Sequence, residues 1–86
     1  PIPPGIYGDM AAMHAHCSQC HRCPLGATRT HAVVGEGNEH ADLMVIGEGP
    51  GQVEDETGRP FVGRSGELLD KILAAVNLTR DRDVFI

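Results

Sequence analysis

Apolar residues follow two different spacings in the second half of the chain. Residues 43–46 form a continuous apolar run, typical of a strand whose two faces are both covered, and we expect that strand over 41–46. Residues 65–76 instead carry apolar residues at helical spacing, which predicts a helix with one buried stripe. The stripe consists of Leu68, Leu69, Ile72, Leu73 and Val76.

A further short strand is expected over 83–86, after a charged turn at 80–82. Ser65 is expected to cap the intervening helix, and Asn77 to end it. A strand, a helix and a second strand in this order predict a parallel pair joined by a crossover. The predicted fold class is therefore α/β, a parallel sheet with flanking helices.

The first half of the chain has weaker signals. Residues 1–8 are rich in proline and glycine and predict an irregular arm. Asp9 is positioned to cap a helix that runs from Met10 toward the three cysteines, and Pro24 and Gly26 should break that helix.

A short strand over 30–34 and a turn over 35–38 are expected to lead into the main apolar run. We therefore divide one domain, residues 1–86, into three parts. They are the irregular arm, a cysteine-containing helix and loop over 9–26, and an α/β unit over 30–86.

Length and charge limit the possible functions. The chain has 86 residues and a formal net charge of −5 with histidines neutral, which argues against simple electrostatic binding to nucleic acid. No apolar run approaches the roughly 18–20 residues of a membrane helix, and the first residues lack the pattern of a secretory leader. We expect an intracellular (cytoplasmic) monomer without membrane association.

The final residues, 83–86, have the pattern of an opening strand. Parallel sheets place their chemistry in the loops that follow such strands. We therefore expect the chain to be the amino-terminal part of a larger domain. The alternative is a complete small α/β protein with a terminal strand.

Residues 47–63 form a long loop after the main predicted strand and are the most informative segment. They include five glycines, two prolines, one aromatic residue and several carboxylates. In open parallel sheets, ligands bind beyond the carboxyl ends of the strands. Glycines let backbone amides approach a ligand closely, and prolines stiffen the loop. The segment therefore predicts a binding or catalytic site.

The cysteines Cys17, Cys20 and Cys23 form a second candidate site. Their spacing is one signature of iron–sulfur ligation, although a cluster commonly needs four thiolates. Zinc is the competing metal, because three histidines, His14, His16 and His21, lie nearby. Unligated thiols and a redox dithiol are the remaining alternatives.

An ordered set of motifs resembles the family-four uracil-DNA glycosylases, the iron–sulfur branch of that superfamily. The resemblance covers about residues 17–86. Its landmarks are Cys20-x-x-Cys23, Arg29, Gly35–Asn38, Gly47–Gly51, Glu54-Asp55, Gly58–Gly63, Gly66 and Leu68–Asp70. The resemblance implies a three-layer α/β/α fold, of which this chain is an incomplete amino-terminal part.

The resemblance also implies hydrolysis of the N-glycosidic bond of uracil in DNA, hence a role in base-excision repair with uracil-containing DNA as partner. A structural 4Fe-4S cluster would be held by Cys20 and Cys23, with Cys17 an additional candidate and the remaining ligands outside this chain. The 86 residues alone are not expected to be active without those further elements.

Site roles follow from the position of each residue in the loop. Glu54 is the predicted catalytic carboxylate, which polarises or positions water, and Glu54→Gln is expected to slow uracil release without unfolding the protein. Glu48 is predicted to act beside it, and Phe61 to stack on the uracil face. Gly49, Pro50, Gly51 and Asp55 are predicted to bind the substrate. Structural alternatives stay open, since acids can cap helices or pair with arginine, and Phe61 can anchor a core.

Arginines are few, and three of them are candidate phosphate contacts: Arg29, Arg59 and Arg64. Lys71 and Arg80 are interpreted as ordinary surface charges. Three other functions compete with the glycosylase. They are a small iron–sulfur electron carrier, a zinc-stabilised binding module without catalysis, and a nucleotide-binding protein. The last is disfavoured because no phosphate-loop signature follows the strand.

Overall fold

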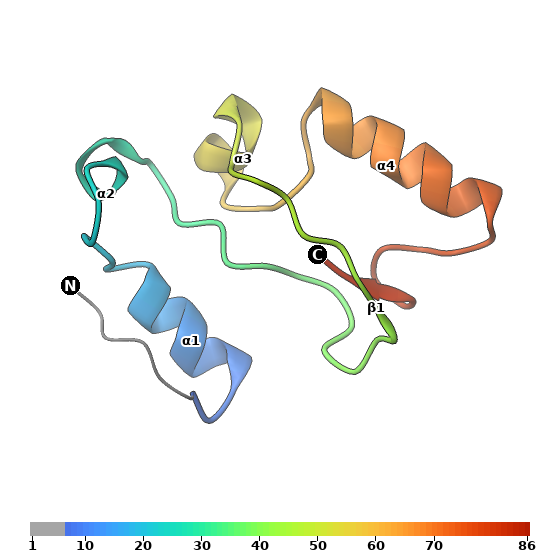
Figure 1. The fold of residues 1–86 in the computed structure, drawn as a ribbon, viewed down its shortest axis with the longest axis horizontal. Helices are drawn as coiled ribbons and strands as arrows, with labels where there is room; N and C mark the ends of the chain where they lie inside the picture. The colour runs from blue at the N-terminus through green and yellow to red at the C-terminus, as the bar shows by residue number, and fades with distance from the viewer. Residues whose placement is uncertain (1–6) are drawn as a thin grey trace.

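The computed structural model describes residues 7–86, so most of the predicted amino-terminal arm lies outside the described residues. Figure 1 shows two short helices, α1 (Met10–Cys17) and α2 (Leu25–Thr28), set apart from the remaining elements. Those elements are β1 (Leu43–Met44), α3 (Gln52–Thr57), α4 (Arg64–Ala75) and β2 (Val84–Phe85). None of the helices within residues 7–86 has both the length and the apolar character needed to cross a bilayer.

Helix α1 begins as predicted. The Asp9 carboxylate accepts a hydrogen bond from the amide of Ala12 at 2.7 Å and so caps the first turn. The helix ends earlier than expected, at Cys17, where the Ser18 hydroxyl donates to the carbonyl of His14 at 2.8 Å. Pro24 and Gly26 therefore do not break α1: Pro24 caps α2, and Gly26 lies inside it.

The strand predicted over 30–34 is not formed, because this segment has no ladder partner in the described part of the chain. The turn predicted over 35–38 is also wrong. Instead, Gly37 forms an antiparallel bridge with Phe85 of β2, and Glu36 and Ile86 exchange backbone hydrogen bonds of 3.0 and 2.9 Å. The turn follows three residues later, over 38–41, and is closed by a hydrogen bond of 3.1 Å from the Ala41 amide to the Asn38 carbonyl.

Strands β1 and β2 pair in parallel, which confirms the predicted strand–helix–strand unit and the α/β class. Leu43 is in register with Val84, and Met44 with Phe85. The Val45 amide adds a hydrogen bond to the Phe85 carbonyl at 2.8 Å beyond the formal end of β1. Strand β1 is shorter than the strand predicted over 41–46, because regular pairing covers only two residues of each strand.

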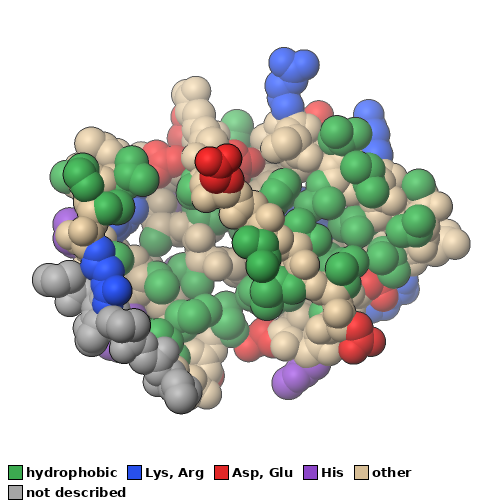
Figure 2. Space-filling view, viewed as in Figure 1, with side chains coloured by type: hydrophobic (Ala, Val, Ile, Leu, Met, Phe, Trp, Pro, Cys, Tyr) green, Lys and Arg blue, Asp and Glu red, His purple; other side chains and the backbone are tan. Residues whose placement is uncertain are grey.

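A small core lies between α4 and the strands. It consists of Leu73, Val84 and Ile86, against which Val45, Phe61, Leu69 and Leu78 pack. The predicted stripe of α4 is only partly buried: Leu69 and Leu73 face this core, whereas Leu68, Ile72 and Val76 are each more than half exposed. Figure 2 shows apolar side chains across the side of the molecule that carries α4.

The expectation that both faces of β1 are covered is also wrong for the described residues. Met44 is 61% exposed and Ile46 is 83% exposed, because no described element packs over that side of the strand. The apolar run does contain β1, but it does not predict burial on both faces, because a sequence pattern does not say how many layers surround a sheet.

Helix α4 begins after an extended glycine and ends before a left-handed asparagine. Its amino-terminal cap is Gly63, two residues before the predicted Ser65. At the other end, Asn77 adopts φ 61°, which confirms it as the stop. The amides of Asn77 and Leu78 then donate to the carbonyls of Ala74 and Leu73 at 3.1 and 2.9 Å, the paired bonds of a Schellman motif.

Candidate active site

A cavity of about 290 Å³ opens at the carboxyl end of β1, where the loop from Gly47 leaves the strand. Five of the seven residues predicted to form the catalytic and substrate-binding site line this cavity. These five are Glu48, Gly49, Pro50, Glu54 and Phe61. Gly51 and Asp55 lie outside its lining.

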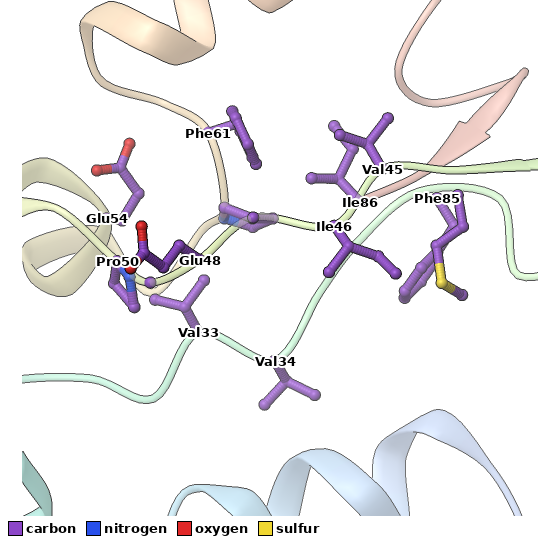
Figure 3. A pocket seen from close by; sticks show the side chains of 14 residues that line it. Val33, Val34, Val45, Ile46, Glu48, Pro50, Glu54, Phe61, Phe85 and Ile86 are labelled. Carbon is purple, nitrogen blue, oxygen red and sulfur yellow. The ribbon is translucent and has the colours of Figure 1, made fainter.

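The rest of the lining is mainly apolar and comes from three separate segments. Val33 and Val34 line the cavity from the segment before β1, Ile46 from just after β1, and Phe85 and Ile86 from the end of β2 and the residue that follows it. Figure 3 shows the carboxylates of Glu48 and Glu54 toward one end of this lining and the side chains of Ile46, Phe85 and Ile86 toward the other. An apolar wall with a few polar groups is typical of a site that binds a small organic group.

Glu54 is buried, with 9% of its surface exposed, and its carboxylate is held by backbone amides. Oε2 accepts hydrogen bonds from Gly63 at 2.6 Å and Val62 at 2.8 Å, and Oε1 accepts one from Gly51 at 3.1 Å. The Gly63 amide first, and then that of Val62, hold the pKa of Glu54 below its usual range. Glu54 is therefore a fixed negative charge at neutral pH.

Glu48 differs from Glu54 although both line the same cavity. It is exposed, and no hydrogen bond or ion pair within residues 7–86 engages its carboxylate. The two acids thus separate into one that is fixed by the backbone and one that is free to bind a ligand or a water molecule.

Phe61 closes the cavity on the side of α4. Its backbone has φ 51°, an uncommon value for a residue with a large side chain. Its ring lies directly on Gly47, where an added Cβ would come within 2.8 Å of Cε2. Only glycine at position 47 leaves room for the ring in this orientation.

Arg80 was missed at the sequence level, where it was interpreted as an ordinary surface charge. Its side chain is only 15% exposed, and it donates hydrogen bonds of 2.6 Å to the carbonyls of both Pro60 and Phe61. A third bond of 3.1 Å joins it to the carboxylate of Asp70. No local pattern reveals this role, because its partners lie 10 to 20 residues away.

Asp55 points to a different part of the molecule. Its Oδ1 atom accepts from the amides of Thr30 at 2.7 Å and His31 at 3.3 Å, and its carbonyl meets Nδ1 of His31 at 2.9 Å. The Thr30 amide is the main cause that lowers the pKa of Asp55. Asp55 therefore attaches the extended segment 30–31 to α3, while Gly51 serves as the cap of α3.

Two of the three candidate phosphate contacts are engaged inside the protein. Arg59 forms a two-pronged ion pair with Glu36, with bonds of 2.9 and 2.8 Å, and this pairing lowers the pKa of Glu36. Arg29 donates to the carbonyls of Cys20 and Ser18 and so folds the cysteine loop onto α2. Arg64 is exposed and has no ion pair in the described part of the chain.

The three cysteines are free thiols spread from the end of α1 to the loop before α2. Within residues 7–86, no three Cys, His, Asp or Glu side chains are grouped to hold a metal ion, so Cys17, Cys20 and Cys23 do not converge as a set. Two thiols on one loop fit the chemistry of a thiolate-ligated centre but make up only half of a four-ligand set. Gly26 allows the loop to pack closely, since a Cβ there would lie 2.8 Å from the Cys20 carbonyl oxygen.

Comparison with known proteins identifies relatives that match most of the chain. The family model described as the uracil DNA glycosylase superfamily matches residues 34–86. A type-4 uracil-DNA glycosylase of Thermotoga maritima is 47% identical over 77 residues, which cover 90% of this chain and 40% of the relative. One from Pyrobaculum aerophilum is 45% identical over 78 residues, covering 91% of this chain and 39% of the relative. The chain thus spans about 40% of the length of these relatives.

Proposed function

The chain belongs to the uracil DNA glycosylase superfamily, and on that premise we propose that the protein removes uracil from DNA by hydrolysing the N-glycosidic bond. One observation carries the proposal. Glu48, Glu54 and Phe61 line a single cavity at the carboxyl end of β1, where a parallel sheet binds its ligands. We also propose that the two-stranded parallel sheet is part of a three-layer α/β/α domain.

The reaction needs an extruded nucleotide, because the bond to be cleaved is inaccessible in a stacked duplex. As that bond breaks, positive charge builds on the sugar and negative charge on the departing base. The cavity has features suited to both the base and the sugar. It offers an aromatic ring for the base, apolar walls that exclude water, and two carboxylates for the sugar side.

We assign different roles to the two acids from their surroundings. Glu54 is ionised and held by three amides, so it supplies a fixed negative charge that stabilises the developing cation. Glu48 has no partner within residues 7–86 and positions the attacking water. The first of these roles revises the prediction that Glu54 itself orients the water, because its oxygen atoms already accept hydrogen bonds from the backbone.

Phe61 is assigned to stacking on the base, and Gly49 and Pro50 to the rim of the cavity around it. Uracil-containing DNA is the proposed partner. Because the chain carries a net charge of −5, we expect phosphate contacts to come chiefly from basic groups outside these 86 residues.

We further propose that Cys20 and Cys23, with Cys17 as an additional candidate, help to hold a 4Fe-4S cluster. Such a cluster would brace the scaffold, and its remaining ligands would come from outside this chain. Arg29 supports the assignment, since its bonds to the carbonyls of Cys20 and Ser18 shape the loop that carries the thiols. Zinc is the alternative, and iron, zinc and sulfide analysis of anaerobically purified protein separates the two.

The decisive experiment measures uracil release by the complete protein from DNA that contains a single uracil, with thymine-containing DNA as control. We expect release from the first substrate only. Glu48→Gln should slow the chemical step by about 10²-fold or more without a loss of folding, because it removes the group that positions water. Absence of release by the wild-type protein with its metal centre intact would overturn the proposal.

A further inference from the structure

Phe61 adopts a backbone conformation that its own side chain disfavours. At φ 51° the Cβ atom is crowded against the backbone, and residues other than glycine seldom stay there unless neighbouring groups hold them. The orientation of the ring depends on this conformation, because a change of φ would carry the ring away from Gly47 and the cavity.

Two charged side chains of opposite sign hold the peptide unit between Phe61 and Val62. Its carbonyl oxygen accepts a hydrogen bond of 2.6 Å from Nη1 of Arg80. Its amide donates one of 2.8 Å to Oε2 of Glu54. A flipped peptide would turn its carbonyl toward the carboxylate and its amide toward the guanidinium, so both interactions would become repulsive.

The neighbouring peptide units repeat this division. The Pro60 carbonyl accepts from Nη2 of Arg80 at 2.6 Å, and the Gly63 amide donates to Glu54 at 2.6 Å. The carbonyls of Pro60 and Phe61 thus face the Arg80 guanidinium. The amides of Val62 and Gly63 face the Glu54 carboxylate. The planar fork of arginine suits two adjacent carbonyls, which a lysine ammonium cannot engage in the same way.

Simple stabilisation does not account well for Arg80. The side chain is largely buried, and its Nε has no hydrogen-bond acceptor within residues 7–86, which is unfavourable for a buried charged group. Arg80 has two ion-pair partners, but Asp70 is half exposed and Glu36 lies 3.8 Å away and is already paired with Arg59, so these pairs add little. What Arg80 fixes most directly is the course of the backbone on either side of the Phe61 ring.

We infer that Arg80 is a positioning residue for base recognition: it fixes the left-handed backbone of Phe61 and thereby points the ring at the extruded base. The inference rests on the proposed function. It adds a residue from the turn before β2 to the carboxylates and the aromatic ring, which all come from the loop after β1.

The test compares Arg80→Gln and Arg80→Lys with Arg82→Gln in the complete protein. Arg82 is the matched control because it lies in the same turn, its side chain is 70% exposed, and it lines no part of the cavity. Two affinities are measured for each variant: inhibition by free uracil, which requires stacking, and binding to DNA with a tetrahydrofuran abasic analogue, which offers no base.

We expect Arg80→Gln to weaken inhibition by uracil about tenfold or more, the range expected for a lost stacking partner, and to leave binding to the abasic analogue unchanged. Arg80→Lys should be intermediate, and it keeps the test usable if Arg80→Gln fails to fold. In a Phe61→Ala background, Arg80→Gln should cause no further loss of uracil affinity, because both changes remove the same interaction.

Equal losses for uracil and for the abasic analogue would show a general structural role and overturn the inference. A full additional loss in the Phe61→Ala background would do the same. These outcomes are distinct from failure of the proposed function, in which the wild-type protein itself neither releases uracil nor is inhibited by it.

Discussion

Oε2 of Glu54 lies 2.6 Å from the amide nitrogen of Gly63, the residue that caps α4. The other oxygen of the same carboxylate accepts from Gly51, which caps α3. One side chain thus satisfies free amides at the start of two helices, where a negative charge is also favoured by both helix dipoles. The Glu54 carboxylate therefore links the start of α3 to residues 62–63, which follow Phe61 and lead into α4.

Replacement of Glu54 by Gln should therefore affect folding as well as activity. Glutamine keeps one acceptor oxygen and presents an NH₂ group to amides that are themselves donors, so at least one amide loses its partner. The sequence alone suggested that Glu54→Gln would slow turnover without unfolding the protein. We now expect a lower urea midpoint together with slower uracil release.

Glu56→Gln is the control for Glu54→Gln. Glu56 lies in the same helix and is exposed, and within residues 7–86 its carboxylate accepts only a bond of 3.1 Å from Gln52. Its replacement should leave the urea midpoint and the rate of uracil release near wild type. A Glu54→Gln variant as stable as Glu56→Gln would mean that the three amide bonds do not support the fold.

The free energy of unfolding should decrease as the solution is acidified, because several carboxylates are held in their ionised form in the folded protein. The pKa values of Glu54, Glu36 and Asp55 are all lowered, by the Gly63 amide, the Arg59 guanidinium and the Thr30 amide respectively. The unfolded chain therefore binds more protons than the folded one below an ordinary carboxyl pKa of about 4. The stabilisation is complete above that pH and is lost as pH falls through the folded-state pKa values.

Urea titrations at a series of pH values from neutral to acid check this sign. The midpoint should be flat near neutrality and should drop with acidification, and Glu54→Gln should drop less steeply because one of the contributing groups is gone. A midpoint that rises on acidification would contradict the assigned pKa directions.

Local patterns predicted some features of this protein because the interactions responsible are local. The cap at Asp9, the stop at Asn77 and the parallel strand–helix–strand unit are confirmed. Each depends on a few adjacent residues or on the alternation of strand and helix. The shared cavity of Glu48, Glu54 and Phe61 was also anticipated, although the chemical roles of these residues remain predictions.

Long-range pairing explains what the sequence did not reveal. Residues 35–38 read as a turn because glycine and asparagine favour turns, yet they extend along β2, about 50 residues later in the chain. Arg80 read as a surface charge because its partners Pro60 and Phe61 are distant in sequence. Burial of Ile72 and Val76 was overpredicted because helical spacing indicates a face but not what packs on it.

Gly66→Ala should lower stability although alanine is the better helix former. A Cβ at position 66 would overlap the carbonyl group of Phe61, which cannot move without breaking its bond to Arg80. We expect a loss of about 1–3 kcal/mol in the free energy of unfolding, against a gain of about 1 kcal/mol expected from helix propensity alone. Ser65→Ala, at the neighbouring exposed position of α4, is the control and should be near neutral.

Asn77 should tolerate glycine but not a β-branched residue. Its φ of 61° ends α4 and allows the Leu78 amide to reach the Leu73 carbonyl at 2.9 Å. Asn77→Gly should leave stability unchanged or slightly higher, whereas Asn77→Val should cost about 1–2 kcal/mol because its Cβ is crowded in this conformation. Equal urea midpoints for the two variants would argue against a left-handed residue at this position.

Arg59 should make no contribution to phosphate binding, in contrast to the expectation from sequence. Its guanidinium is already bound through two hydrogen bonds to Glu36, and both bonds would have to break before it could reach a phosphate. The salt dependence of DNA affinity measures the number of phosphate contacts, and loss of one contact lowers the slope by about 1. We expect Arg59→Gln to leave that slope unchanged.

Two comparisons make this measurement decisive. Arg64→Gln removes an exposed cation that has no ion pair within residues 7–86, and it shows how far the slope moves when an unpaired arginine near the site is lost. Glu36→Gln weakens the ion pair that holds Arg59. If the salt-dependence slope steepens in Glu36→Gln but not in the double variant Glu36→Gln/Arg59→Gln, the ion pair is what keeps Arg59 from binding DNA. A shallower slope in Arg59→Gln alone would show instead that the pair opens on binding, and Arg59 would return to the set of phosphate contacts.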